Sequence, residues 1–275
     1  MICRGNPLWL PLLQTTSRAN YMSRFLIVLI QLFAFWPVWQ WYFLRTLDSP
    51  ENRWGLLAVG TLILYFLIHK KTEIASDSLL LPALLTLLYA ISYPFLPPLL
   101  RAAIAVLAIG STLGVLRFGK AMPPGVWGLL LLALPVIPSL QFYLGYPLRL
   151  IVASVAAPLI RLTGFVVVQE GVYLNWYNHP ILIDAPCSGI KMLWAGFFLT
   201  FTLASFYHLS LWRTVIISIL AFLMILLGNI FRATALFYVE VGIVPFPAWT
   251  HTGIGLLMFA FVAVGIVWCV QKIIS

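Results

Sequence analysis

Long apolar stretches dominate this chain and restrict it to folds that hold most of its residues in lipid. Of the 275 residues, 63% are hydrophobic and 8% are charged, a composition that excludes a soluble globular domain. A spanning helix needs roughly 20 apolar residues. On this rule the sequence predicts an all-α polytopic membrane protein with about eight transmembrane helices. The predicted spans are residues 25–44, 54–68, 79–96, 99–118, 126–144, 188–207, 211–241 and 250–270.

The basic residues predict how these spans are oriented. Lys and Arg gather in cytoplasmic loops, and with the N-terminus inside, nine of them fall on the cytoplasmic side and five outside. We therefore expect a multi-pass protein of the cytoplasmic membrane, with a basic cytoplasmic arm at residues 1–24. The net charge of +9 indicates contact with anionic lipid headgroups, since no nucleic-acid motif accompanies it.

One long connection, residues 145–187, separates a five-helix half (25–144) from a three-helix half (188–275). We expect its first part, 147–163, to be a short helix in the outer interface, because Pro158 interrupts it. Its second part alternates β-branched and aromatic residues with turn residues, which predicts a small strand-rich hairpin cap on the extracytoplasmic side. If 147–163 spans the membrane instead, everything after it changes sides.

Three polar residues stand in or at the mouth of different apolar segments: Cys187, Arg232 and His251. In the predicted topology, Cys187 and His251 begin helices at the outer side. Arg232 lies nine residues before Val241, about 13 Å below the outer end of its helix at 1.5 Å per residue, and its side chain reaches about 6 Å further. The three groups can therefore meet in the outer leaflet.

Cys187 is a candidate nucleophile. Ser188 is a candidate N-cap, so the sulfur would lie at a helix N-terminus, where partial positive charge lowers the pKa of a thiol. The alternative is that Cys187 is a small apolar filler, the interpretation that we give to Cys3 and Cys269. No disulfide framework is predicted, because the three cysteines lie far apart.

Arg232 is a functional-site candidate because a charge deep in a span costs about 2.5 kcal/mol or more. Asn229 lies one turn earlier on the same face and could orient it. The guanidinium would stabilise an oxyanion or bind a substrate carboxylate. The alternative is a structural arginine that pairs with Glu240 or with a lipid phosphate.

His251 could accept the thiol proton and return it to a leaving amine, although a histidine at a helix start is also often a polar cap. We expect His69 and His208 to be solvated, and His179 to lie in the hairpin turn as a reserve base.

Three further charged residues border the predicted site. Lys191, one turn beyond Cys187, could stabilise a thiolate or extend to the interface. Asp184 and Glu170 could orient His251 or bind a substrate cation, or they could be solvated loop carboxylates.

The order of these features resembles the exosortase and archaeosortase family of membrane transpeptidases. The resemblance rests on a strand-rich cap, Cys187-Ser188-Gly189 opening a helix, Asn229-x-x-Arg232 inside the next helix, and His251 opening the last. It covers about residues 164–265. The family more often has Glu-Ala where this chain has Ala185-Pro186.

This resemblance implies a sortase-like cysteine transpeptidase with Cys187 as nucleophile, Arg232 as stabiliser of the acyl intermediate and His251 as acid and base. It implies membrane-anchored substrates whose C-terminal signal has a short motif, a transmembrane helix and a basic tail. We expect no cofactor and no metal ion.

Two other functions stay open from the sequence. One is a rhomboid-like intramembrane serine protease that uses Ser188 and His251. The other is a non-catalytic transporter or assembly subunit in which Arg232 binds an anion.

Overall fold

The computed structural model describes residues 26–69, 79–118, 122–177, 179–242, 247 and 249–274. The predicted basic arm at residues 1–24, with Cys3, lies outside the described residues. The chain divides into two compact units. The first contains the described residues up to Asp48 together with Phe66–Met122, and the second contains Ser49–Tyr65 and Pro123–Ser275.

The first unit is helical. A helix at Leu26–Ala34 bends by 53° into α2 (Trp36–Asp48), and Pro37 in the first turn of α2 accounts for the bend. Two more helices, α4 (Leu80–Ser92) and α5 (Pro98–Leu113), follow, and α5 continues into a π-helical turn, η2 (Gly114–Phe118).

A buried polar link holds three helices of this unit together. Gln31 donates to Thr86 Oγ1 at 3.1 Å and accepts from Thr112 Oγ1 at 2.9 Å. Such pairing satisfies an amide that would be costly to bury alone in lipid.

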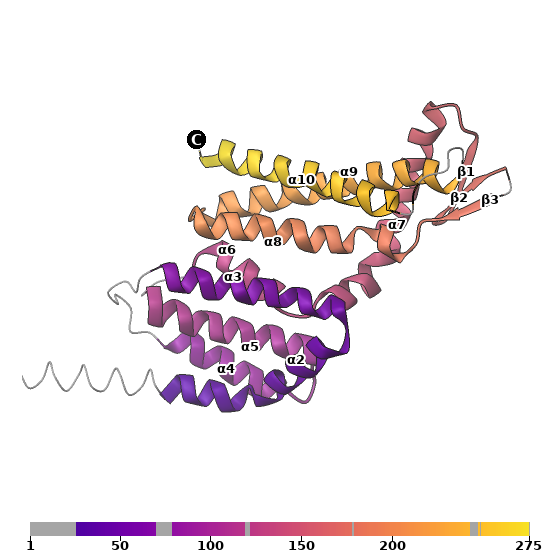
Figure 1. The fold of residues 1–275 in the computed structure, drawn as a ribbon. Coiled ribbons are helices and arrows are strands. Elements are labelled where there is room, and N and C mark those ends of the chain that lie inside the picture. Colours follow the sequence, from indigo (N-terminus) through magenta and orange to yellow (C-terminus); the bar gives the residue numbers. More distant parts are fainter. Residues whose placement is uncertain are drawn as a thin grey trace, which may run out of the picture. The chain divides into compact units, whose positions relative to one another are not determined.

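The second unit contains every residue of the predicted site. Figure 1 shows three of its helices, α8, α9 and α10, lying side by side, with the small sheet at the far end of α7. Its helices are η1 (Pro50–Trp54), α3 (Gly55–Ile68), which begins in this unit, α6 (Pro124–Leu132), α7 (Ile137–Leu162), α8 (Ile190–Phe206), α9 (Leu211–Glu240) and α10 (Thr250–Ile274).

Glycines allow these helices to approach closely. A Cβ on Gly125 of α6 would lie 2.5 Å from the backbone nitrogen of Ser205 on α8, and a Cβ on Gly228 of α9 would lie 2.5 Å from Val262 on α10. Helix association in lipid depends on such close backbone contact, because burial of apolar surface gives little driving force there.

Five described helices are long and apolar enough to cross a membrane: Pro50–Ile68, Pro98–Leu116, Ile137–Leu162, Leu211–Glu240 and Thr250–Ile274. The bent pair at Leu26–Asp48 makes six if it counts as one span. The predicted count of eight is not confirmed, because α4 and α8 have 13 and 17 residues and a third predicted span is interrupted.

The interrupted span is the one predicted at residues 126–144. Helix α6 ends at Leu132, and α7 begins at Ile137 and continues to Leu162 without a break at residue 145. The prediction of a separate interfacial helix at 147–163 is therefore wrong. Pro135 lies in the interruption, whereas Pro147 and Pro158 lie inside α7, where helices in lipid tolerate proline if neighbours satisfy the freed carbonyls.

The predicted strand-rich cap is a three-stranded antiparallel sheet, β1 (Val167–Glu170), β2 (Tyr173–Trp176) and β3 (His179–Leu182), in the order β1-β2-β3. Two residues join β1 to β2, and the first, Gly171, has φ +60°, the sign that a tight hairpin requires. The buried face of the sheet packs on α7 and α9 through Val167, Leu174, Ala156 and Leu236.

Candidate active site

Cys187 lies in a short turn rather than in the first turn of a long helix. Residues Ala185–Ser188 form a 3-10 helix, η3, which is called the Cys187 turn below. Asp184 caps it, since its Oδ1 accepts from the backbone N–H of Cys187 at 3.2 Å. The turn ends at Gly189, whose φ of +79° reverses the chain before α8 begins at Ile190. Asp184 thus holds the turn, a role that the sequence analysis did not assign to it.

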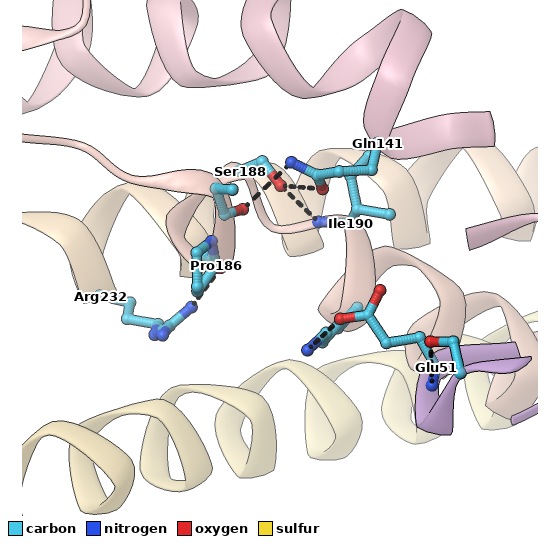
Figure 2. Close-up of polar contacts among 9 residues, drawn as sticks. Glu51, Gln141, Pro186, Ser188, Ile190 and Arg232 are labelled. Carbon is cyan, nitrogen blue, oxygen red and sulfur yellow. Dashed lines mark hydrogen bonds and ion pairs between the residues drawn. The ribbon is translucent and has the colours of Figure 1, made fainter. Parts of the chain in front are cut away.

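Side chains from two helices bind three successive carbonyls of the Cys187 turn. Gln141 of α7 donates to the carbonyl of Ala185 at 3.3 Å, and Arg232 of α9 donates to that of Pro186 at 3.2 Å. Figure 2 shows these two side chains reaching the turn from different helices. Asn229, also on α9, donates to the carbonyl of Cys187 itself at 2.9 Å.

Each of these bonds anchors a carbonyl of the Cys187 turn to a side chain of a long helix. The predicted partnership between Asn229 and Arg232 takes a different form: the two side chains bind consecutive carbonyls of the same turn. The Cys187 sulfur is thereby held at a fixed position relative to α9.

A cavity of about 560 Å³ opens beside Cys187. One wall is the sheet and the segment leading from β3 to the Cys187 turn, and the other is the last turns of α9 and the start of α10. Four ionisable residues besides Cys187 line it: His179, Asp184, Glu240 and His251. The structure therefore brings the predicted nucleophile and the predicted base to one cavity.

Arg232 is not among the residues that line this cavity, although its neighbour Ala233 is, and its side chain lies against the start of α10. A Cβ on Gly255, one turn after His251, would lie 3.4 Å from Arg232 Nε. That Nε is buried and has no hydrogen-bond partner among the described residues. No ion pair between Arg232 and Glu240 is found in the described part of the chain, so the structural pairing considered from the sequence is not observed there.

Burial raises the pKa of the Cys187 thiol to about 12. The hydrogen bond to Asp184 and the negative charges of Asp184 and Glu240 raise it as well, and Arg232 lowers it. This result contradicts the prediction of a thiol whose pKa is lowered by a helix N-terminus. The physical reason is that α8 starts three residues later, beyond the left-handed Gly189.

Ser188 faces away from the cavity. Its hydroxyl donates to Gln141 Oε1 at 2.9 Å and accepts from the N–H of Ile190 at 3.4 Å, whereas α8 itself is capped by Gly189 without a side-chain bond. Ser188 lines a different, much smaller pocket with Gly189 and Asn229, and His251 is not part of that pocket.

Lys191 does not approach the sulfur in this structure. Its Nζ forms an ion pair with Glu51 Oε1 of η1 at 2.8 Å, and both side chains are about half exposed. The predicted electrostatic help to a thiolate is thus replaced by a tether between α8 and η1.

Two residues of the site were missed or misplaced by sequence reasoning. His179 lies in β3 and lines the cavity, not in the hairpin turn where we expected it. Gln141 was not singled out, although an amide inside an apolar predicted span is an available signal. The remaining candidates lie apart from the cavity: Glu170 in β1, His69 after α3, His208 after α8, and Cys269 in α10.

Comparison with known proteins identifies the family. The chain matches the family model described as transmembrane exosortase (Exosortase_EpsH) over residues 15–268. No curated protein and no solved structure gives a significant match. Because the family match covers nearly the whole chain, helices of unit 1 included, the protein belongs to the transmembrane exosortase family, a family of membrane transpeptidases and proteases.

Proposed function

We propose that this protein is a cysteine transpeptidase or peptidase of the membrane that cleaves C-terminal sorting signals through a thioester at Cys187. The observation that carries the proposal is the shared cavity: Cys187 and His251, from separate elements, line the same space. Arg232 is bonded to the backbone one residue before the nucleophile.

In the first step, His251 removes the thiol proton and the sulfur attacks the carbonyl carbon of the scissile peptide bond. When the tetrahedral intermediate collapses, the C–N bond breaks and the leaving amine takes the proton back from His251. A thioester between Cys187 and the N-terminal part of the substrate results. Water or an amine then attacks the thioester carbonyl and releases the thiol.

The raised pKa of Cys187 supports the need for a base. A thiol of pKa about 12 is almost entirely protonated near neutral pH, so it is inert until its proton is transferred. A protein that keeps its nucleophile protonated at rest avoids unspecific alkylation and oxidation.

Arg232 is suited to a developing negative charge. The terminal nitrogen Nη1 donates to the carbonyl of Pro186, and because Nε is buried, the terminal nitrogens are the donors that a substrate would meet. A guanidinium so placed would stabilise an oxyanion or bind a carboxylate of the recognition motif.

The proposed substrates are membrane-anchored secreted proteins with a short motif, an apolar helix and a basic tail at the C-terminus. Such a helix can enter the site laterally, within the bilayer, and present the peptide bond just outside it. The proposed location is the cytoplasmic membrane, with the cavity on the extracytoplasmic side.

A processing assay tests this proposal. A secreted protein of the same genome that carries such a signal is co-expressed with Cys187→Ala, Ser188→Ala and His251→Ala variants, and the cleaved product is measured. We expect Cys187→Ala and His251→Ala to abolish cleavage and Ser188→Ala to retain it, with a hydroxylamine-sensitive adduct on Cys187. His69→Ala is the matched control, because His69 does not line the cavity and Ala removes an imidazole there too.

The serine-protease alternative gains no support from the geometry, because Ser188 and His251 line different pockets. Loss of cleavage in Ser188→Ala with full activity in Cys187→Ala would restore it. Undiminished cellular function in a Cys187→Ala, Arg232→Ala double variant would favour a non-catalytic role.

A further inference from the structure

Strand β3 is the last strand of the sheet, so within the described residues one of its edges has no strand beside it. The ladder shows which backbone groups lie on that edge. The N–H of Ile183 donates to the carbonyl of Val172 at 3.0 Å. In an antiparallel ladder, alternate residues bond to the same neighbour. Ile181 and Ile183 therefore bond toward β2, and Leu182 between them directs its N–H and C=O to the free edge.

Pro180 fits this assignment. It pairs with Asn175 of β2 in the register, two residues before Leu182, and so its backbone also faces the free edge. Proline has no N–H, and in a strand it is tolerated at positions whose N–H would point away from the neighbouring strand. The free edge consequently offers the carbonyls of Pro180 and Leu182 and the N–H of Leu182.

The cavity follows this edge to the nucleophile. All six residues from His179 to Asp184 line it, followed by Cys187. Consecutive side chains of a strand point to opposite faces, so a cavity that contacts every residue must extend around the edge of the strand. Its opposite wall contains the apolar Leu236 and Phe237 of α9 together with the ionisable Glu240 and His251.

We propose that an extended segment of the polypeptide substrate pairs with the free edge of β3 as a fourth strand, which delivers the next peptide bond to Cys187. This inference rests on the proposed function, since it requires a peptide substrate. Main-chain bonds to Leu182 and Pro180 would supply affinity, and alternate substrate side chains would enter the apolar part of the cavity and supply selectivity.

The chemistry of the edge favours this occupant. Backbone donors and acceptors at strand spacing, in a cleft whose opposite wall carries both apolar and ionisable side chains, are matched by an extended backbone and not by a lipid chain or a simple ion. Pairing also fixes the register of the substrate, because a shift by one residue would exchange the side chains that face the cavity.

The first test changes the enzyme. Leu182→Pro removes the outward N–H, and Leu182→Ala removes the side chain but keeps the N–H. In the processing assay with the purified full chain in vesicles, we expect Leu182→Pro to raise KM about fivefold over Leu182→Ala, the effect of one backbone hydrogen bond. The kcat of the two variants should be similar. The rate of Cys187 alkylation reports whether each variant retains the fold.

The second test changes the substrate and does not depend on the folding of a variant. The probe is a synthetic peptide with the sequence that precedes the apolar helix of the processed protein, methylated at one backbone nitrogen at a time. We expect methylation at every second residue to weaken its competition with processing about fivefold, and methylation at the residues between to have little effect.

Equal KM values for the two Leu182 variants, together with no period of two in the methylated series, would overturn the strand pairing. If Leu182→Pro fails to fold, the methylated series alone decides. Failure of the proposed function gives a different result, namely processing that persists in Cys187→Ala.

Discussion

Gly189→Ala probes how firmly the Cys187 turn is held. Gly189 has φ +79°, and a left-handed backbone costs about 1 to 2 kcal/mol for a residue with a Cβ. The added Cβ would also lie 2.8 Å from Cγ and Nδ2 of Asn229, the side chain that binds the Cys187 carbonyl. Moving that amide aside forfeits a hydrogen bond of about 1 kcal/mol. We therefore expect Gly189→Ala to destabilise the Cys187 turn, which carries the proposed nucleophile, by about 2 to 3 kcal/mol in total.

Gly171→Ala is the matched control. Gly171 also has a positive φ, +60°, but nothing lies within 4 Å of its added Cβ. It carries the backbone strain without the collision. In the processing assay, Gly189→Ala should lower kcat/KM about 100-fold, because a displacement of about 1 Å is enough for such a loss. Gly171→Ala should stay within about twofold of the parent protein.

A double-mutant cycle separates the two contributions. In an Asn229→Ala background the collision at Gly189 is gone, so Gly189→Ala should there cost only the left-handed strain. If Gly189→Ala and Gly171→Ala process substrate equally well, the Asn229 bond does not position the sulfur and the reasoning is refuted.

Four further predictions concern the site and its surroundings. Alkylation of Cys187 by iodoacetamide should accelerate up to at least pH 10, because the pKa of the thiol is about 12, and a plateau below pH 9 would contradict this. Asp184→Asn removes a negative charge that raises the pKa of Cys187, so the variant should be alkylated faster at pH 8. Slower alkylation would contradict the role of Asp184 in raising this pKa. Gln141→Ala should lower the kcat of processing about tenfold with little change in KM. Gln141→Glu keeps the oxygen that accepts from Ser188 but loses the N–H that donates to Ala185, so it should recover part of the lost kcat. Replacing the half-exposed pair with Lys191→Met and Glu51→Gln should change the free energy of unfolding by no more than about 1 kcal/mol and leave processing within about twofold; a larger loss of activity would give Lys191 a catalytic part.

The sequence was sufficient to bring two of the three predicted residues to one cavity, because ionisable side chains are rare in an apolar chain, whereas Arg232 is not among the lining residues. Cys187 and His251 were expected to share one space, and they line one cavity. The strand-rich cap was also predictable, since alternation of β-branched residues around Gly171 is a local signal.

Contacts between distant residues could not be predicted in this way. Lys191 pairs with Glu51, which precedes it by 140 positions, and no local pattern connects them. The orientation of His179 toward the cavity depends on the register of β3 against β2, which shifts every side chain to the other face if it changes by one residue.

The effect of each proline on its helix could not be predicted from the sequence either. Pro135 lies in the interruption between α6 and α7, whereas Pro147 and Pro158 lie within one continuous helix. Whether a proline ends a helix in lipid depends on the neighbours that satisfy the freed carbonyls, and sequence alone does not contain these neighbours.

The length of α9 has a consequence for the supply of water. Its 30 residues extend about 45 Å, while the hydrocarbon layer is about 30 Å thick, so about five residues at each end, or about ten at one end, extend beyond the lipid. The exposed Trp212 near its first turn is typical of a residue anchored among headgroups, which assigns the overhang to the opposite end. A length of about 30 Å along α9 from Trp212 ends at Arg232. The last turns of α9, which line the cavity, extend beyond this point. In the proposed mechanism, water then reaches a thioester at Cys187 directly from the aqueous phase, without crossing the hydrocarbon layer.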